Sequence, residues 1–164
     1  MGIQFRRIDK SEHAFLKEML YEALFVPPGK PKFPKEILHN PQIKKYIENW
    51  GQQTGDVAIV AVNHNVLVGA IWGRKHPLKN KGYGFIDEET PEISMAVQKV
   101  HRNKGIGTEL IKRIETAYSE IGIKNVSLSV DKLNPAKLLY ERNGYVFVEE
   151  NGTAITMRKK VKKE

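Results

Sequence analysis

The sequence predicts a mixed α/β protein in which about four helices flank a central sheet of about six to seven strands. Three observations lead to this fold class. Strand and helix patterns follow the order strand, helices, three strands, helix, strand, helix, two strands. The 164 residues suffice for one hydrophobic core, and 40% hydrophobic with 28% charged residues is ordinary for a globular chain. One helix in the second half carries a continuous apolar stripe, as expected when a helix covers a sheet.

Local signals define the elements of the first half. Apolar residues recur at helical spacing over residues 11–24, and a Pro-Pro-Gly run ends that helix. Asn40-Pro41 combines a capping residue with a proline, which is typical of a helix start, and Gly51 ends this helix. The expected elements are a strand at 3–8, a helix at 11–24, a loop with a short helix at 31–39, a helix at 40–51, a strand hairpin at 56–62 and 66–72, a long polar loop at 74–91, and a strand at 93–97.

The second half gives clearer signals. Residues 105–121 place apolar side chains on one helical face and charged side chains on the other, and Gly122 follows as a C-cap. Asn134-Pro135 repeats the helix-start pattern, and Asn-Gly at 151–152 is a strong hairpin signal. The expected elements are a helix at 105–121, a strand at 126–130, a helix from 134 to 143, and a closing strand pair at 145–149 and 154–158.

The composition excludes several classes of site. With no cysteine, the chain has no disulfide, thiolate metal site or cysteine nucleophile. Its five histidines are scattered without metal-ligand spacing, so we expect no metal. No stretch approaches the roughly 20 apolar residues that a membrane helix needs, and the N-terminus lacks the apolar region of a signal peptide. We therefore expect a cytoplasmic protein without a membrane partner.

The net charge of +8 points to a polyanionic partner, either nucleic acid or a cofactor with several phosphates. Part of the charge lies in a basic run near the C-terminus, for which a solvated tail is the simpler interpretation. The predicted organisation is one domain over residues 1–158 followed by a basic tail at 159–164. Nucleic-acid binding by this tail is a minor alternative and would weaken steeply with salt.

A phosphate-binding signal precedes the long helix. Between a strand and this helix the chain reads Arg102-Asn103-Lys104-Gly105-Ile106-Gly107-Thr108. A helix N-terminus presents free N–H groups and the positive end of the helix dipole, and glycines let the backbone approach a ligand closely.

Two common phosphate motifs fit this segment poorly. A P-loop needs Lys and then Ser or Thr after its last glycine, whereas Thr108 directly follows Gly107. The dinucleotide fingerprint needs a third small residue where the chain has Leu110, and it belongs early in a doubly wound fold.

The segment instead resembles the Gln/Arg-x-x-Gly-x-Gly/Ala signature of the GNAT N-acetyltransferase superfamily, through Arg102, Gly105 and Gly107. A second stretch, Asn134-Pro135-Ala136 followed by Leu139-Tyr140-Glu141-Arg142-Asn143-Gly144-Tyr145, is similar to the family's Asn-x-x-Ala…Leu-Tyr-x-x-x-Gly-Phe segment. The resemblance covers roughly residues 92–158 and implies the GNAT fold and an acetyl-CoA cofactor.

The resemblance also implies where this cofactor binds. The strand before the signature would pair with the pantetheine arm, and a Val97 N–H would polarise the thioester carbonyl. Arg102 would position the loop, and Asn134 would either hydrogen-bond the arm or only cap its helix. The implied cofactor-binding residues are Met95, Ala96, Val97, Arg102, Asn103, Lys104, Gly105, Ile106, Gly107, Thr108, Asn134 and Tyr140.

Two residues are the catalytic candidates. By resemblance, Tyr140 would protonate the leaving thiolate, and the alternative is a tyrosine buried on the apolar side of its helix. Glu92 opens the strand toward the cofactor and would be the general base, the alternative being an exposed strand-end glutamate. The carboxylates of Asp87, Glu88 and Glu89 could instead bind a cationic acceptor.

The expected reaction is acetyl transfer from acetyl-CoA to a primary amine, on a small molecule or a peptide, by a monomer or homodimer. The alternative function is a GNAT-like module that binds acyl-CoA without catalysis. An acceptor pocket is expected between the N-terminal helices and the 74–91 loop. Four aromatic residues either line this pocket or pack in the core: Trp50, Trp72, Tyr83 and Phe85.

Overall fold

The computed structural model describes residues 2–161. The strands are β1 (Gln4–Arg7), β2 (Val57–Asn63), β3 (Val66–Arg74), β4 (Glu92–Val97), β5 (Asn125–Asp131), β6 (Val146–Asn151) and β7 (Ala154–Lys160). The α-helices are α1 (Ala14–Ala23), α2 (Pro41–Lys44), α3 (Ile106–Glu120) and α4 (Ala136–Arg142), and short 3-10 helices span Lys10–Glu12, Lys35–His39, Leu78–Asn80 and Lys99–His101. All strands and α-helices of the expected order are present.

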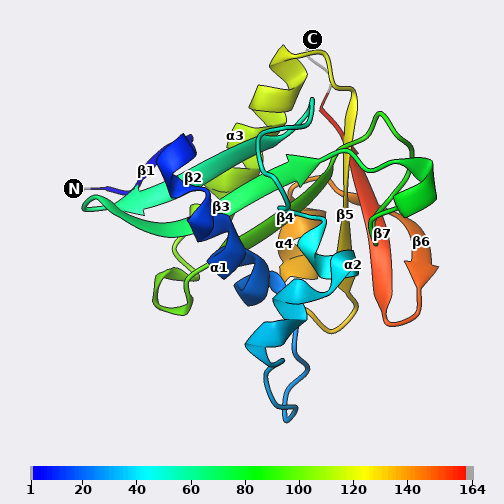
Figure 1. The fold of residues 1–164 in the computed structure, drawn as a ribbon, viewed down its shortest axis with the longest axis horizontal. Helices are drawn as coiled ribbons and strands as arrows, with labels where there is room; N and C mark the ends of the chain where they lie inside the picture. The colour runs from blue at the N-terminus through cyan, green and yellow to red at the C-terminus, as the bar shows by residue number, and fades with distance from the viewer. Residues whose placement is uncertain (1, 162–164) are drawn as a thin grey trace.

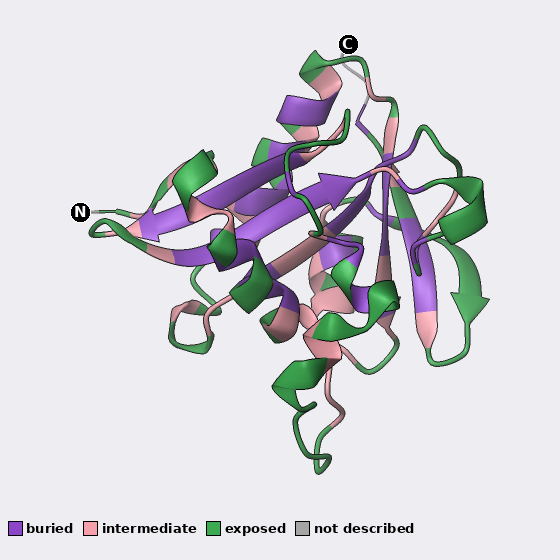
Figure 2. Ribbon diagram, viewed as in Figure 1, coloured by how far each residue is buried: buried purple, intermediate pink, exposed green. Residues whose placement is uncertain are grey.

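One seven-stranded sheet runs through the molecule in the order β1-β2-β3-β4-β5-β7-β6 (Figure 1). All neighbouring strands are antiparallel except β4 and β5, which are parallel. The inner strands carry most of the buried residues, whereas β6 at the edge is exposed along its length (Figure 2). The predicted mixed sheet is therefore confirmed.

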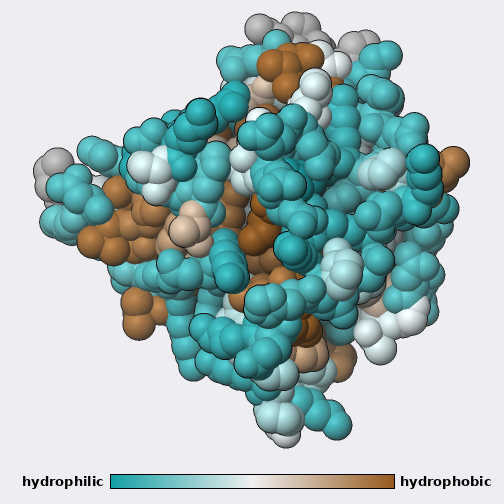
Figure 3. All heavy atoms as spheres, viewed as in Figure 1, coloured by the Kyte–Doolittle hydropathy of each residue, from teal (hydrophilic) through white to brown (hydrophobic). Residues whose placement is uncertain are grey.

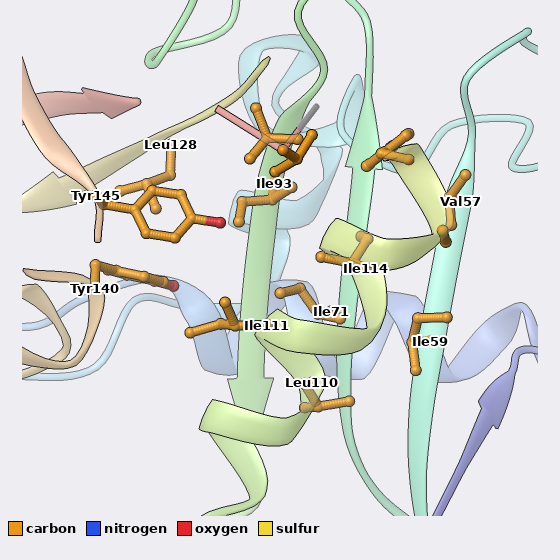
Figure 4. Packing of buried hydrophobic residues seen from close by; sticks show 14 of the residues in the cluster. Val57, Ile59, Ile71, Ile93, Leu110, Ile111, Ile114, Leu128, Tyr140 and Tyr145 are labelled. Atoms are coloured by element: carbon orange, nitrogen blue, oxygen red, sulfur yellow. The ribbon is translucent and has the colours of Figure 1, made fainter. Parts of the chain in front are cut away.

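Helices cover both faces of the sheet and create two cores. Helix α3 packs on β2 and β3 from one side, and α1 packs on β3 and β4 from the other. The apolar stripe predicted for α3 is buried, and Figure 4 shows Leu110, Ile111 and Ile114 directed at the strand side chains Ile59 and Ile71. No helix within residues 2–161 is long and apolar enough to cross a bilayer. The cytoplasmic location stays a prediction.

Helix α2 is shorter than the sequence predicted. It begins at Pro41 with the Asn40 side chain accepting a hydrogen bond from Gln42 N, as expected, but it ends at Lys44 instead of continuing to Gly51. The buried guanidinium of Arg74 explains the difference, because it donates to the carbonyl oxygens of Lys45 at 2.9 Å and Glu48 at 2.8 Å. These two carbonyl oxygens accept hydrogen bonds from a side chain of β3, whereas in a helix they would accept from backbone N–H groups four residues later. The segment after Lys44 is therefore a series of turns.

The C-terminal strand is longer than predicted. Strand β7 continues through Lys160, and the Lys159 ammonium lies 2.8 Å from the Glu115 carboxylate of α3. The side chain of Val161 is buried. The boundary expected at residue 158 therefore falls inside this strand, and residues 162–164 of the basic run lie outside the described residues.

The junction of β4 and β5 positions the functional site. Glu92 and Ser127 form the one residue pair of this parallel ladder, and Ser127 N donates to Pro91 O at 3.0 Å. Beyond that point the two strands diverge, whereas the pairing of β4 with β3 continues to Val97. The sheet therefore opens into a wedge in the middle of the molecule.

Candidate functional site

A cavity of about 950 Å³ occupies the wedge between β4 and β5. Its lining comes from α1 and the segment that follows it, the open length of β4, the N-terminus of α3, part of β5 and helix α4, together with Ile43, Tyr46 and Tyr83. In the surface view, hydrophobic atoms are visible between hydrophilic ones in the middle of the face shown (Figure 3). The sequence predicted thirteen residues to bind the cofactor or to take part in catalysis. The structure places all of them except Lys104 on the cavity wall.

The register of β4 determines which backbone groups face the wedge. Gln98 N donates to Val68 O on β3, and Pro91 O accepts from Ser127 N on β5. Backbone groups of an antiparallel strand point alternately to its two sides. The N–H and C=O groups of Met95 and Val97 therefore face the wedge, whereas those of Ala96 face β3. Two of the three predicted strand residues thus offer backbone groups to a ligand, and Ala96 offers only its side-chain surface.

Arg102 fixes the loop that follows β4. Its Nε donates to the carbonyl oxygen of Val97 at 2.8 Å, and its Nη2 lies 3.9 Å from the Glu22 carboxylate of α1. The Val97 carbonyl is therefore bound to the protein, and the Val97 N–H remains on the wedge side. This geometry agrees with a positioning role for Arg102.

The N-terminus of α3 opens onto the same cavity. Gly105 is the N-cap residue with φ of 82°, a left-handed conformation that favours glycine, and no described side chain caps this helix. The first-turn N–H groups are consequently available to an anion. A Cβ on Gly107 would lie 3.0 Å from Leu139 Cδ2 and 3.4 Å from Met95 Cε, so a larger residue here would narrow the cavity. These features fit the diphosphate of a coenzyme A molecule.

Helix α4 brings Asn134 and Tyr140 to the opposite wall. The Asn134 side chain accepts a hydrogen bond from Ala136 N at 2.9 Å, so it stabilises the start of α4 while also lining the cavity. Tyr140 is buried, and this burial alone raises the pKa of its phenol. Figure 4 shows its ring reaching from α4 toward Ile111, edge-on to Tyr145 at a centroid distance of 5.7 Å. A phenol of this kind stays protonated at neutral pH.

Glu92 is a buried carboxyl group and not an exposed strand-end residue. Its Oε2 accepts a hydrogen bond of 2.7 Å from the Tyr46 hydroxyl, which in turn accepts one of 2.7 Å from Tyr83 N. Burial raises the pKa of Glu92 to about 7, although the hydrogen bond from Tyr46, the nearby Gly84 backbone and the charge of Lys45 act in the opposite direction. The pKa of Glu92 therefore lies near neutral pH instead of near the ordinary 4.5.

The loop between β3 and β4 encloses this carboxyl group. A Cβ on Gly82 would lie 2.1 Å from Glu92 Oε1 and 2.8 Å from the Tyr46 hydroxyl, so only glycine fits there. A Cβ on Gly84 would overlap the backbone of Leu128 at 2.6 Å. The two glycines thus let the loop lie directly against the open end of the wedge.

Sequence reasoning missed three members of this cluster, namely Tyr46, His76 and Gly82. His76 is buried with its ring edge-on to Tyr46, at 5.0 Å between centroids, and burial lowers the pKa of its imidazole to about 4. The available signal was the pair of glycines in the long polar loop. Nothing local in the sequence linked that loop to Tyr46.

The remaining candidates, apart from Tyr83, lie outside the cavity wall. Asp87 accepts hydrogen bonds from Glu89 N and Thr90, Glu88 accepts one from Leu78 N, and all three predicted loop carboxylates are absent from the cavity wall. Of the four aromatic candidates, Tyr83 lines the cavity, Trp50 and Trp72 are buried in the core beneath α1, and Phe85 lies under the Lys81 ammonium.

Fold and site together define a protein that can hold a phosphorylated ligand in a wedge between two parallel strands, beside a buried carboxyl group. The family model of the acetyltransferase (GNAT) family matches residues 18–145, and the chain belongs to this family. The resemblance to this family, inferred from the sequence, is thereby confirmed. The family uses acetyl-CoA, the cofactor that the sequence predicted, and the open β4 backbone and the uncapped α3 N-terminus fit it.

Solved structures share the fold. A GNAT-family acetyltransferase from Staphylococcus aureus Mu50 has a TM-score of 0.71 at 19% identity, over 98% of this chain and 100% of that one. The PaiA N-acetyltransferase from Thermoplasma acidophilum, in complex with coenzyme A, has a TM-score of 0.66 at 21% identity, over 98% and 99%. YncA, described as an acetyltransferase from Salmonella typhimurium with its cofactor acetyl-CoA, has a TM-score of 0.68 at 16% identity, over 100% and 96%. Among curated proteins, no sequence match was found.

Proposed function

We propose that this protein is an N-acetyltransferase that moves the acetyl group of acetyl-CoA to a primary amine by direct attack on the thioester. The observation that carries the proposal is the buried Glu92, whose pKa of about 7 suits a group that must accept a proton at neutral pH. Acetyl-CoA supplies the activated acyl group. The residues of the chain bind it, orient the amine and move the protons.

Glu92 removes a proton from the incoming ammonium group. Primary amines are largely protonated at neutral pH, and only the neutral amine is a nucleophile. The carboxylate is held by the Tyr46 hydroxyl at 2.7 Å, at the base of the wedge, where an amine next to the thioester would lie. The Val97 N–H, directed into the wedge, is suited to polarise the thioester carbonyl.

Tyr140 protonates the leaving thiolate. Its raised pKa keeps the phenol protonated at neutral pH, so the proton is available when the thiolate forms beside it. Because Tyr140 lies on α4 and Glu92 on β4, the acid and the base reach the cavity from different elements. This separation of roles is what direct transfer between two substrates requires.

The acceptor part of the cavity is largely apolar. The lining outside the cofactor-binding elements consists of Leu20, Glu22, Ala23, Leu24, Phe25, Val26, Ile43, Tyr46 and Tyr83. Glu22 is the one charged member of that set, and it faces Arg102 at 3.9 Å. An apolar wall favours an acceptor whose amine is attached to an apolar or aromatic group over an acceptor that has a second charged group. We therefore expect 2-phenylethylamine and peptides with an apolar first residue to exceed putrescine in kcat/KM by about tenfold or more.

Thiol release from acetyl-CoA in the presence of these amines tests the proposal. Wild type should release thiol only when an amine is present, and Tyr140→Phe should lower kcat by about a hundredfold while the Kd for acetyl-CoA is nearly unchanged. Equal losses of kcat and of affinity would contradict the acid role. If acetyl-CoA binds but no amine in a broad panel accelerates thiol release, the non-catalytic acyl-CoA-binding module would be the better description.

A further inference from the structure

Two buried polar atoms beside the active site face each other without partners. Glu92 Oε1 and His76 Nε2 are 4.0 Å apart, and neither has a hydrogen bond to any described residue. Buried polar atoms are usually paired, so these two facing atoms are candidates for a contact that forms during the reaction. Closing the gap to hydrogen-bond distance needs a movement of about 1 Å, and catalytic hydrogen bonds often tighten only when substrates are bound.

His76 also borders a second cavity. This cavity has a volume of about 300 Å³ and lies outside the wedge, and its walls include Lys45, Arg74, Lys75, His76 and Asn80. Glu92 borders only the first cavity and His76 only the second. The imidazole therefore lies next to the Glu92 carboxyl group on one side and borders the second cavity on the other.

The proposed reaction needs such an opening. An ammonium acceptor loses two protons when its nitrogen becomes an amide nitrogen, and the leaving thiolate takes up one of them through Tyr140. The other proton stays on Glu92 and must reach solvent before the next turnover. Glu92 is only 4% exposed, so it has little direct contact with water from the wedge, and acetyl-CoA and an acceptor bound there would reduce that contact further.

We propose that His76 relays the proton of Glu92 to water in the second cavity, a step that rests on the proposed acetyltransferase function. The Glu92 carboxyl O–H transfers its proton to the lone pair on His76 Nε2, which restores the carboxylate and gives an imidazolium. The imidazolium passes its Nδ1 proton to water in the second cavity. Exchange of the remaining ring proton from Nε2 to Nδ1, through water, restores the starting tautomer.

The surroundings of His76 favour brief protonation and fast release. Burial, together with the positive charges of Lys45 and Arg74, lowers the pKa of His76 to about 4, while Asp56 acts in the opposite direction. The Tyr46 ring packs against the imidazole and Gly82 lies against its edge, so these contacts hold the ring between the two cavities. An imidazolium formed there is a stronger acid than an ordinary one. It therefore gives its proton to water readily and does not trap it.

Chemical rescue distinguishes a relay from a structural role. His76→Ala removes the ring and enlarges the second cavity toward Glu92, and we expect kcat with a saturating amine to fall about ten- to a hundredfold while acetyl-CoA affinity is retained. Added imidazole should restore much of the lost kcat. Thiazole has a ring of similar size but very weak basicity, and it should not restore activity. The glutamine of His76→Gln fills the site but has no basic nitrogen that could accept a proton, so this variant should be as slow as the alanine variant.

The controls separate the outcomes. His39→Ala changes an exposed histidine outside both cavities and should leave kcat unchanged. Wild-type kcat in His76→Gln would overturn the relay, and so would equal rescue of His76→Ala by thiazole and imidazole, because the ring would then act only by filling space. A wild type that acetylates no amine would overturn the acetyltransferase function and the relay together, whereas an active wild type with insensitive His76 variants overturns the relay alone.

Discussion

The Tyr46 hydroxyl is a sensitive point of the site, because it donates to Glu92 Oε2 at 2.7 Å and accepts from Tyr83 N at 2.7 Å. Tyr46→Phe removes the hydroxyl and leaves a ring of the same shape. The hydrogen bond stabilises the carboxylate, so its loss should raise the pKa of Glu92 above its present value of about 7.

The size of the effect follows from the strength of such bonds. A hydrogen bond to a charged group contributes about 1.5–3 kcal/mol, and one pKa unit corresponds to about 1.4 kcal/mol. The pKa of Glu92 in the variant is then expected at about 8 to 9. At pH 7 the ionised fraction would fall from about one half to between about 10% and 1%, and kcat by about five- to fiftyfold.

The assay is the pH profile of kcat with both substrates saturating. The rising limb should move to higher pH in Tyr46→Phe, and activity near pH 9 to 9.5 should approach that of wild type. Tyr83→Phe is the matched control, since it keeps the backbone N–H that binds Tyr46 and removes only a hydroxyl from an exposed ring. A uniform loss at every pH, or a limb that moves to lower pH, would refute the reasoning.

Three further outcomes are expected. Glu92 has a folded-state pKa of about 7 against an ordinary 4.5, so its contribution to stability is full below pH 4.5 and is lost as the pH rises through 7; Glu92→Gln should raise the free energy of unfolding by up to about 3 kcal/mol at pH 8 and change it little at pH 4.5, measured by urea denaturation. Gly107→Glu puts a Cβ 3.0 Å from Leu139 and a negative charge at the α3 N-terminus; calorimetric titration should show loss of acetyl-CoA binding, with an unchanged circular dichroism spectrum as the control. Gly73→Ala places a Cβ 2.3 Å from the Tyr118 hydroxyl oxygen and should destabilise the fold by about 1–3 kcal/mol; an unchanged Tm would show that the tyrosine moves away at no cost.

Short sequence motifs made the part of the site assigned to the cofactor predictable. The glycine-bearing start of α3, Arg102 and Tyr140 lie within segments whose spacing is visible in the sequence, and they line the cavity as a group. The environment of Glu92 was not visible in this way. Its hydrogen-bond partner Tyr46 lies 46 residues earlier in the chain, and the two meet only because the turns after α2 and the glycine loop fold over the wedge. Those turns themselves depend on Arg74, which binds two of their carbonyl oxygens from β3.

The parallel ladder between β4 and β5 consists of a single residue pair, which has a mechanical consequence. The sheet is two plates, β1 to β4 and β5 to β7, joined edge to edge at Glu92 and Ser127 and bridged by α3. The amide protons of Met95 and Val97 lie on the free edge of the first plate, so they should exchange with solvent deuterium much faster than that of Ala96, whose bond to β3 protects it. A ligand that takes the place of the missing ladder would slow that exchange selectively and stiffen the joint between the plates.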